Sequence, residues 1–179
     1  CDMGADAVIA GHTHCPQGFE MYEGKPIIYS MGNFLFKSSS ERSANDSWYY
    51  GYMTELDIDK SGIDFCIIPY NFNSEATRIT VFEGDEKRKM LRYIDSLSEI
   101  IKDPQLLDNY FSGWAYLHKW VPQAPSNYFD LKEYNSSGNY NLISCESHLS
   151  QAKKVLEFCF LDRVENAKEW SEKIKELTV

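Results

Sequence analysis

The segment Gly11-His12-Thr13-His14 places two imidazoles two residues apart, directly after the apolar run at residues 7–10. Neutral imidazole is a common metal ligand. If the backbone stays extended through Thr13, alternate residues project to one side, and His12 and His14 converge on neighbouring ions. Histidine pairs at this spacing also occur without any metal, so the pattern predicts a metal site only when its surroundings support one.

Two stretches supply that support: residues 4–20 read GADAVIAGHTHCPQGFE, and residues 24–34 read GKPIIYSMGNF. Together they closely resemble the carboxyl-terminal part of the CapA-like proteins, the poly-gamma-glutamate and capsule-biosynthesis branch of the calcineurin-like metallophosphoesterases. A weaker resemblance covers residues 141–148. The resemblance implies that His12 and His14 ligate a dinuclear metal centre, one to each ion.

The family's other ligand blocks are an Asp-x-His, a Gly-Asp, a Gly-Asn-His-Asp/Glu and a further histidine, and none of them occurs in this sequence. Two histidines do not make a two-metal site, which also needs bridging carboxylates. We therefore expect the intact protein to begin before Cys1. Its missing amino-terminal half would supply the remaining ligands, and this fragment alone would be inactive.

Three polar residues near the histidine pair were weighed as further ligands. Phe34 stands where the family's asparagine block needs a histidine, so we interpret Asn33 as structural, or at most as lining the site. Cys15 could bind metal as a thiolate, but the resemblance gives it no such role. Asp6 precedes the histidines by a strand's length and fits a helix-strand junction better than a ligand.

The resemblance implies two divalent cations, with zinc, manganese and iron not distinguished by these ligand types. Such a centre would polarise a phosphoryl oxygen and activate a bound water, which makes the intact protein a metal-dependent hydrolase in cell-surface polymer assembly. The alternative is a non-catalytic component that binds or exports an anionic polymer such as poly-gamma-glutamate. Both imply a bacterial protein, and any envelope anchor would lie upstream.

The charge, the hydropathy and the cysteine content of the sequence limit the kinds of partner that the protein can have. The net charge of −9 argues against nucleic acid, which requires clustered basic residues. No stretch approaches the ~18–20 apolar residues of a membrane span. The five cysteines are odd in number and scattered, which predicts reduced, mostly buried thiols and neither a disulfide framework nor a zinc finger.

The fold class predicted from these features is α/β, namely the carboxyl-terminal part of a four-layer αββα metallophosphoesterase-like sandwich followed by a helical extension. Residues 1–82 would belong to the CapA-like domain and residues 83–179 to the extension. Expected strands cover residues 7–10, 19–22, 26–29, 50–59 and 63–70, the last two joined by a turn. The polar segment 37–47 is predicted to be a loop, either closing over the site or lying plainly on the surface.

After residue 84 the apolar period becomes helical, and four helices are expected with a Pro-, Ser-, Asn- and Gly-rich loop at about residues 122–139. We interpret His118 and His148 as satisfied, partly exposed histidines. A group of aromatic residues on the second helix favours helix packing, with a polymer-stacking face as the alternative. The predicted core-facing stripes are Met90, Ile94, Leu97 and Ile101; Leu107, Tyr110, Trp114, Leu117 and Val121; Leu142, Cys145, Leu149, Ala152, Leu156 and Cys159; and Ala167, Trp170, Ile174 and Leu177, while the aromatic group is Tyr110, Phe111, Trp114, Tyr116 and Trp120.

Overall fold

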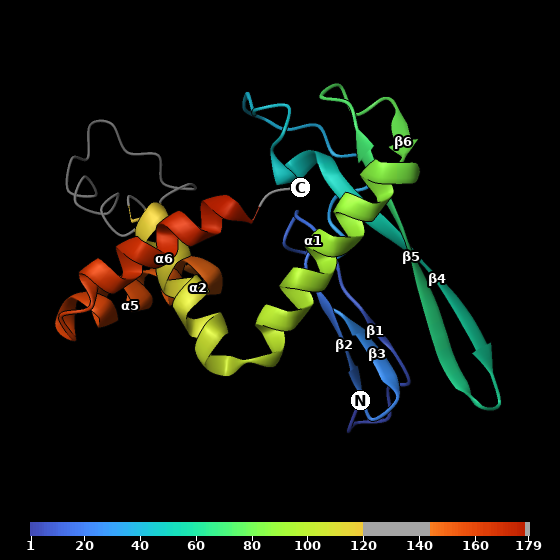
Figure 1. Cartoon of the computed structure of the whole chain (residues 1–179), viewed down its shortest axis with the longest axis horizontal. Helices are drawn as coiled ribbons and strands as arrows, with labels where there is room; N and C mark the ends of the chain where they lie inside the picture. Colours follow the sequence, from blue (N-terminus) through green and yellow to red (C-terminus); the bar gives the residue numbers. More distant parts are fainter. Residues whose placement is uncertain (120–143, 178–179) are drawn as a thin grey trace. The chain divides into compact units, whose positions relative to one another are not determined.

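The computed structural model describes residues 1–119 and 144–177 of the chain, which is a mixed α/β structure (Figure 1). It divides into two compact units, residues 1–103 and residues 104–178. Each unit is described by itself. Among the described residues, no helix is both long enough and apolar enough to cross a membrane.

The first unit begins with a three-stranded sheet in the order β1-β3-β2. Strand β1 (Val8–Ile9) runs parallel to β3 (Lys25–Ile28), with Val8 opposite Ile27. Strand β2 (Phe19–Tyr22) pairs with β3 as an antiparallel hairpin. Glu23 and Gly24 at its turn both have positive φ, 49° and 77°, as a two-residue hairpin turn requires.

A second sheet has the order β4-β5-β6, formed by β4 (Tyr50–Asp59), β5 (Gly62–Phe72) and β6 (Ile79–Val81). Strands β4 and β5 make a long antiparallel ribbon that extends well beyond β6 (Figure 1). In its outer half, Asp57 lies directly opposite Asp64. A short 3-10 helix, η1 (Ser47–Tyr49), leads into β4, and Asp46 caps it by accepting a hydrogen bond from the Trp48 backbone.

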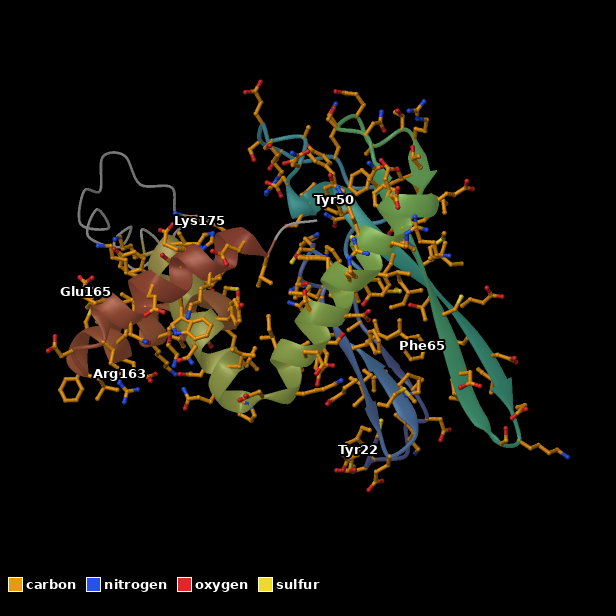
Figure 2. The ribbon with its side chains drawn as sticks, viewed as in Figure 1. Tyr22, Tyr50, Phe65, Arg163, Glu165 and Lys175 are labelled. Atoms are coloured by element: carbon orange, nitrogen blue, oxygen red, sulfur yellow. The ribbon has the colours of Figure 1, made fainter. Side chains whose placement is uncertain are left out.

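Helix α1 (Gly84–Lys102) completes the core of the first unit. Phe65 of β5 and Phe19 of β2 meet edge to face with ring centroids 5.0 Å apart (Figure 2 labels Phe65). Gly18 lets α1 approach closely, since an added Cβ would lie 2.6 Å from the Ser98 backbone nitrogen. The buried core residues are Ile28, Tyr52, Phe82, Met90 and Ile94.

The second unit contains helices α2 (Pro104–Leu117), α5 (Glu146–Phe160) and α6 (Val164–Glu176). Gly113 is the point of close approach between α2 and α6, since an added Cβ would lie 2.6 Å from the Trp170 carbonyl carbon. Lys154 is buried and pairs with Asp108 at 2.6 Å and with Glu157 at 3.0 Å. The buried apolar residues of this unit are Ala115, Phe158 and Ala167.

The predicted strands are confirmed apart from their ends, and the three-residue strand β6 was missed. The predicted apolar stripes of two helices are wrong. On α2 the buried residues are Ser112, Gly113 and Ala115, and on α5 they are Gln151, Lys154 and Phe158. The exposed residues are Leu107, Trp114 and Leu117 on α2, and Leu149, Leu156 and Cys159 on α5.

On α2 the physical reason is the close approach of the helix backbones at Gly113, which places small residues inside and turns the large apolar ones outward. On α5 the buried face holds Phe158 and two polar side chains that have partners, because Gln151 donates to the His118 carbonyl and Lys154 pairs with Asp108. On α1, Ser98 and Ile100 are buried, whereas Leu97 and Ile101 are half-buried. The cysteines are free but none is buried, so the expectation of buried thiols is wrong. Val121, Leu142 and the loop expected near residues 122–139 lie outside the described residues.

Candidate metal centre

The histidine pair lies on a turn directly after β1. His14 has φ 62°, so the backbone is not extended through Thr13, and the predicted reason for convergence is wrong. The two imidazoles nevertheless lie near each other, with ring centroids 6.3 Å apart and planes inclined by 46°. A turn with a left-handed residue, and not alternation along a strand, brings the two rings this close.

His14 is held on three sides. Its Nδ1 lies 2.8 Å from Oδ1 of Asn33, which stands 19 positions later in the chain. Trp48 stacks on the imidazole with centroids 5.0 Å apart and planes inclined by 15°, and Phe36 meets it edge-on at 5.0 Å. A left-handed backbone costs a non-glycine residue about 1–3 kcal/mol, so these contacts hold the ring against local strain.

His12 differs from His14 in every one of these respects. Its side chain is exposed, and within residues 1–119 and 144–177 its ring has no hydrogen bond. The pair therefore combines one imidazole of fixed orientation with one that can adjust to a bound ion.

Imidazole nitrogens fit divalent zinc, iron or manganese, but two of them do not complete a centre. Among the described residues there is no group of three or more His, Cys, Asp or Glu side chains that could hold an ion. Asp6 forms an ion pair with Lys25 at 3.4 Å. Partial burial raises the pKa of the Cys15 thiol, so in the absence of metal it is protonated at neutral pH.

The polar segment 37–47 begins right after Phe36 and ends at Trp48, so it starts and finishes beside His14. The Arg42 guanidinium lies 4.2 Å from the Trp48 ring centroid and pairs with Asp46 at 3.1 Å. This segment borders a hollow of about 720 Å³, lined by Lys37, Arg42, Tyr49, Glu75 and serine hydroxyls. The hollow combines cationic, carboxylate and hydroxyl groups on the segment that follows Phe36.

The two remaining histidines lie in the second unit. His118 is satisfied as predicted, because its Nδ1 bonds the Trp114 carbonyl at 2.9 Å and its ring stacks on Trp114. His148 is half-buried, but its Nδ1 has no partner in the described part of the chain, which differs from the satisfied histidine predicted.

The aromatic group of α2 is divided. Tyr110 packs edge to face on Trp170, as helix packing requires, whereas Phe111 and Trp114 stack on each other and Trp114 is exposed. Trp120 lies outside the described residues.

The chain is thus a mixed α/β protein in which a short parallel strand is followed by a turn that carries two histidines. Residues 1–38 match the family described as bacterial capsule synthesis protein PGA_cap. The chain is 29% identical over 103 residues to the PGA biosynthesis protein CapA of Bacillus subtilis, which covers 57% of this chain and 24% of that protein. It is 37% identical over 46 residues to the capsule biosynthesis protein CapA of Bacillus anthracis, covering 26% of this chain and 11% of that protein.

These likenesses support the resemblance inferred from the histidine block: residues 1–38 match the PGA_cap family, and the chain is similar to two CapA proteins over part of its length. The matched stretch spans about a quarter of the length of the Bacillus subtilis relative.

Sequence reasoning missed Asn33 as the partner of His14 and Trp48 as its stacking surface. Neither follows from local spacing, since Asn33 is 19 positions away and Trp48 lies beyond a long loop. The signal available was the Gly32-Asn33 pair, which follows residues 29–31 after β3, the strand that pairs with β1.

Proposed function

We propose that His12 and His14 are the last ligands of a dinuclear metal centre in a CapA-like protein of capsule or poly-gamma-glutamate biosynthesis. The observation that carries the proposal is the pair of imidazoles 6.3 Å apart on the turn after β1, with the His14 ring held by Asn33 and Trp48. The names of two relatives support a role in capsule or poly-gamma-glutamate biosynthesis, because one is called a PGA biosynthesis protein and the other a capsule biosynthesis protein.

The remaining ligands come from residues outside this chain, on the other strands of a metallophosphoesterase-like αββα sandwich. Strand β1 supports this, because it pairs only with β3 among the described residues, and Ile9 on it is 40% exposed. A parallel strand is normally buried on both faces and flanked by further strands.

Divalent cations held at this site would polarise a phosphoryl oxygen and lower the pKa of a bound water, which is the chemistry of phosphoester hydrolysis. The chain's own contribution is to bind and to orient. His12 and His14 each present an imidazole nitrogen, and Trp48 and Phe36 cover the His14 ring and limit the access of water to it.

The test is metal analysis of the intact protein, which should contain about two divalent ions per chain. The combined variant His12→Ala with His14→Asn should lose most of that metal. Asparagine is chosen because it tolerates the left-handed backbone that His14 adopts, so the loss reports on ligation and not on strain.

His118→Asn is the matched control and should keep the full metal content, because that ring is satisfied within the second unit. Unchanged metal in the double variant would overturn the assignment. The isolated 179-residue chain should bind zinc weakly, and nanomolar affinity in that chain would contradict the requirement for outside ligands.

A second candidate function is the binding of an anionic polymer without catalysis, favoured by the cationic and hydroxyl groups that line the hollow of segment 37–47. Its cations are partly neutralised, since Lys37 pairs with Glu75 at 2.7 Å and Arg42 pairs with Asp46. If this function holds, the intact protein should bind poly-gamma-glutamate in a salt-dependent manner.

The variant Lys37→Gln with Arg42→Gln should weaken that binding, whereas Lys60→Gln at the exposed turn of the ribbon should not. Hydrolysis of a phosphodiester that survives the Lys37 and Arg42 changes but disappears with the histidine changes would favour the enzyme. Polymer binding with no metal and no hydrolysis would favour the binding protein.

A further inference from the structure

The side-chain amide of Asn33 has only one orientation that its surroundings allow. Its nitrogen lies 3.1 Å from the carbonyl oxygen of His14 and 3.1 Å from that of Trp48. Both carbonyls can only accept hydrogen bonds, so the atom facing them must be the amide nitrogen, which donates. The opposite orientation would bring three oxygens together without a proton between them.

This orientation determines where the proton of the His14 ring lies. The amide oxygen of Asn33 lies 2.8 Å from Nδ1 of His14, and an amide oxygen can only accept. Nδ1 must therefore carry the proton, and in the neutral ring the lone pair is left on Nε2.

We propose that Asn33 is a positioning residue for His14, which holds the imidazole as the Nδ1–H tautomer and directs the Nε2 lone pair to a metal ion. The identity of the ligand as a metal rests on the proposed function, but the tautomer does not. In metal sites, the second nitrogen of a ligating histidine commonly donates to such an acceptor.

Asn33 is itself fixed in the core of the first unit. It is 6% exposed, and its backbone carbonyl accepts a hydrogen bond from the Tyr70 hydroxyl at 3.0 Å. Gly32 has φ +79°, and a Cβ there would lie 2.7 Å from the Tyr50 carbonyl oxygen. Contacts with Tyr50 of β4 and Tyr70 of β5 therefore fix the backbone around Asn33. The Asn33 side chain in turn fixes the orientation of the His14 imidazole.

Asn33 also joins the two ends of the site. Through one amide it bonds the ring and the backbone of His14 and the backbone of Trp48, whose indole stacks on the same ring. One side chain therefore sets the tautomer, the backbone turn and the stacking surface together.

The experiment is nitrogen-15 NMR of the 179-residue chain with labelled histidine, at a pH where the rings are neutral. The chain has four histidines, so four ring systems are expected. Nitrogen shifts and long-range proton couplings distinguish the two tautomers. His118 is an internal reference, because its Nδ1 faces a carbonyl and must also carry the proton. His12 is the contrasting reference, since a histidine side chain whose ring has no hydrogen-bond partner favours the Nε2–H form.

His14 should show the Nδ1–H pattern in the unaltered chain. Asn33→Leu removes the acceptor and should shift His14 towards the Nε2–H pattern of His12, while leaving His118 unchanged. Asn45→Leu in the exposed loop is the matched control and should change nothing.

An Nε2–H pattern for His14 in the unaltered chain would overturn the proposal, and this result does not depend on whether any variant folds. A well-folded Asn33→Leu chain that keeps the Nδ1–H pattern would also overturn it. In the intact protein Asn33→Leu should weaken metal affinity by about 10–100-fold. If the tautomer behaves as expected while the intact protein holds no metal, the proposed function fails and the positioning role stands.

Discussion

The two compact units build their cores from opposite kinds of residue. In the first unit, large aromatic side chains are fully buried and their hydroxyls bond the backbone of loops: Tyr52 donates to the Gln17 carbonyl at 2.9 Å, and Tyr70 to the Asn33 carbonyl. In the second unit, the small residues Gly113, Ala115, Ala167 and Ser171 lie at the centre, and Phe158 is the large apolar side chain buried with them.

The difference concerns what each unit holds in place. Tyrosine hydroxyls in the first unit tie the segments that carry His14 and Asn33 to the sheets, so the core fixes the geometry of the site. Small residues in the second unit let helix backbones come close, and the large apolar side chains of α5 turn outward, with Leu156 68% and Phe160 89% exposed. Charged side chains such as Glu165 and Lys175 extend outward from α6 (Figure 2).

The comparison is broken most directly by truncating one large apolar residue in each unit. Tyr52→Ala should lower the unfolding free energy of the first unit by about 3–5 kcal/mol, because it leaves a cavity in a buried core. Leu156→Ala should change stability by less than about 0.5 kcal/mol, because that side chain is exposed. Hydrogen exchange of amides in β4 and α5 measures both.

Tyr52→Phe separates the hydroxyl from the ring in the same experiment. It should cost about 1 kcal/mol for the lost hydrogen bond to Gln17. Equal effects of Tyr52→Ala and Leu156→Ala would show that the two cores do not differ as described.

A methyl group added at the helix contact sharpens the comparison. Gly113→Ala should destabilise the second unit by about 1–3 kcal/mol despite the better helix propensity of alanine, because its Cβ would press on the backbone of α6. Gly11→Ala is the matched control, since a Cβ there meets nothing within 4 Å. Thermal unfolding followed by circular dichroism at 222 nm reports the loss of helix, and a stabilised Gly113→Ala chain would contradict the close packing.

Alkaline pH should destabilise the first unit through its buried tyrosines. Burial raises the pKa of Tyr70 to about 12 and that of Tyr93 to about 12, whereas tyrosine in the unfolded chain ionises near 10. Between these values the unfolded state has lost protons that the folded state keeps, so stability is full below pH ~10 and falls as pH rises towards 12.

Tyr70→Phe should make this decline shallower, and Tyr22→Phe on exposed β2 should leave it unchanged. Chemical denaturation at a series of pH values, followed by hydrogen exchange in β5, measures the slope. A slope that Tyr70→Phe leaves unaltered would contradict the buried hydroxyl.

The strands and the histidine pair could be predicted from sequence because their signals are local. Residues 53–59 alternate polar and apolar side chains, and β4 is found where that alternation and its turn place it. Strand β6 was missed because three residues are too short for a period to show.

The helix faces could not be predicted in the same way. An apolar stripe predicts the buried side of a helix only when large side chains fill the contact. On α2 the contact with α6 is made at Gly113, where only a residue without a side chain fits, so the buried side is not the apolar stripe. The partners of His14 were also out of reach, because a turn and two distant segments bring Asn33 and Trp48 to the ring.

The outer half of the β4–β5 ribbon has its own consequence. Only these two strands pair there among the described residues, so each has a backbone edge able to recruit a strand from another molecule. Asp57 facing Asp64 puts like charges on adjacent strands, which weakens the ribbon slightly but makes its surroundings repellent to a second copy. The same carboxylates should therefore keep concentrated solutions free of fibrils, and neutralising them would trade that solubility for a firmer ribbon.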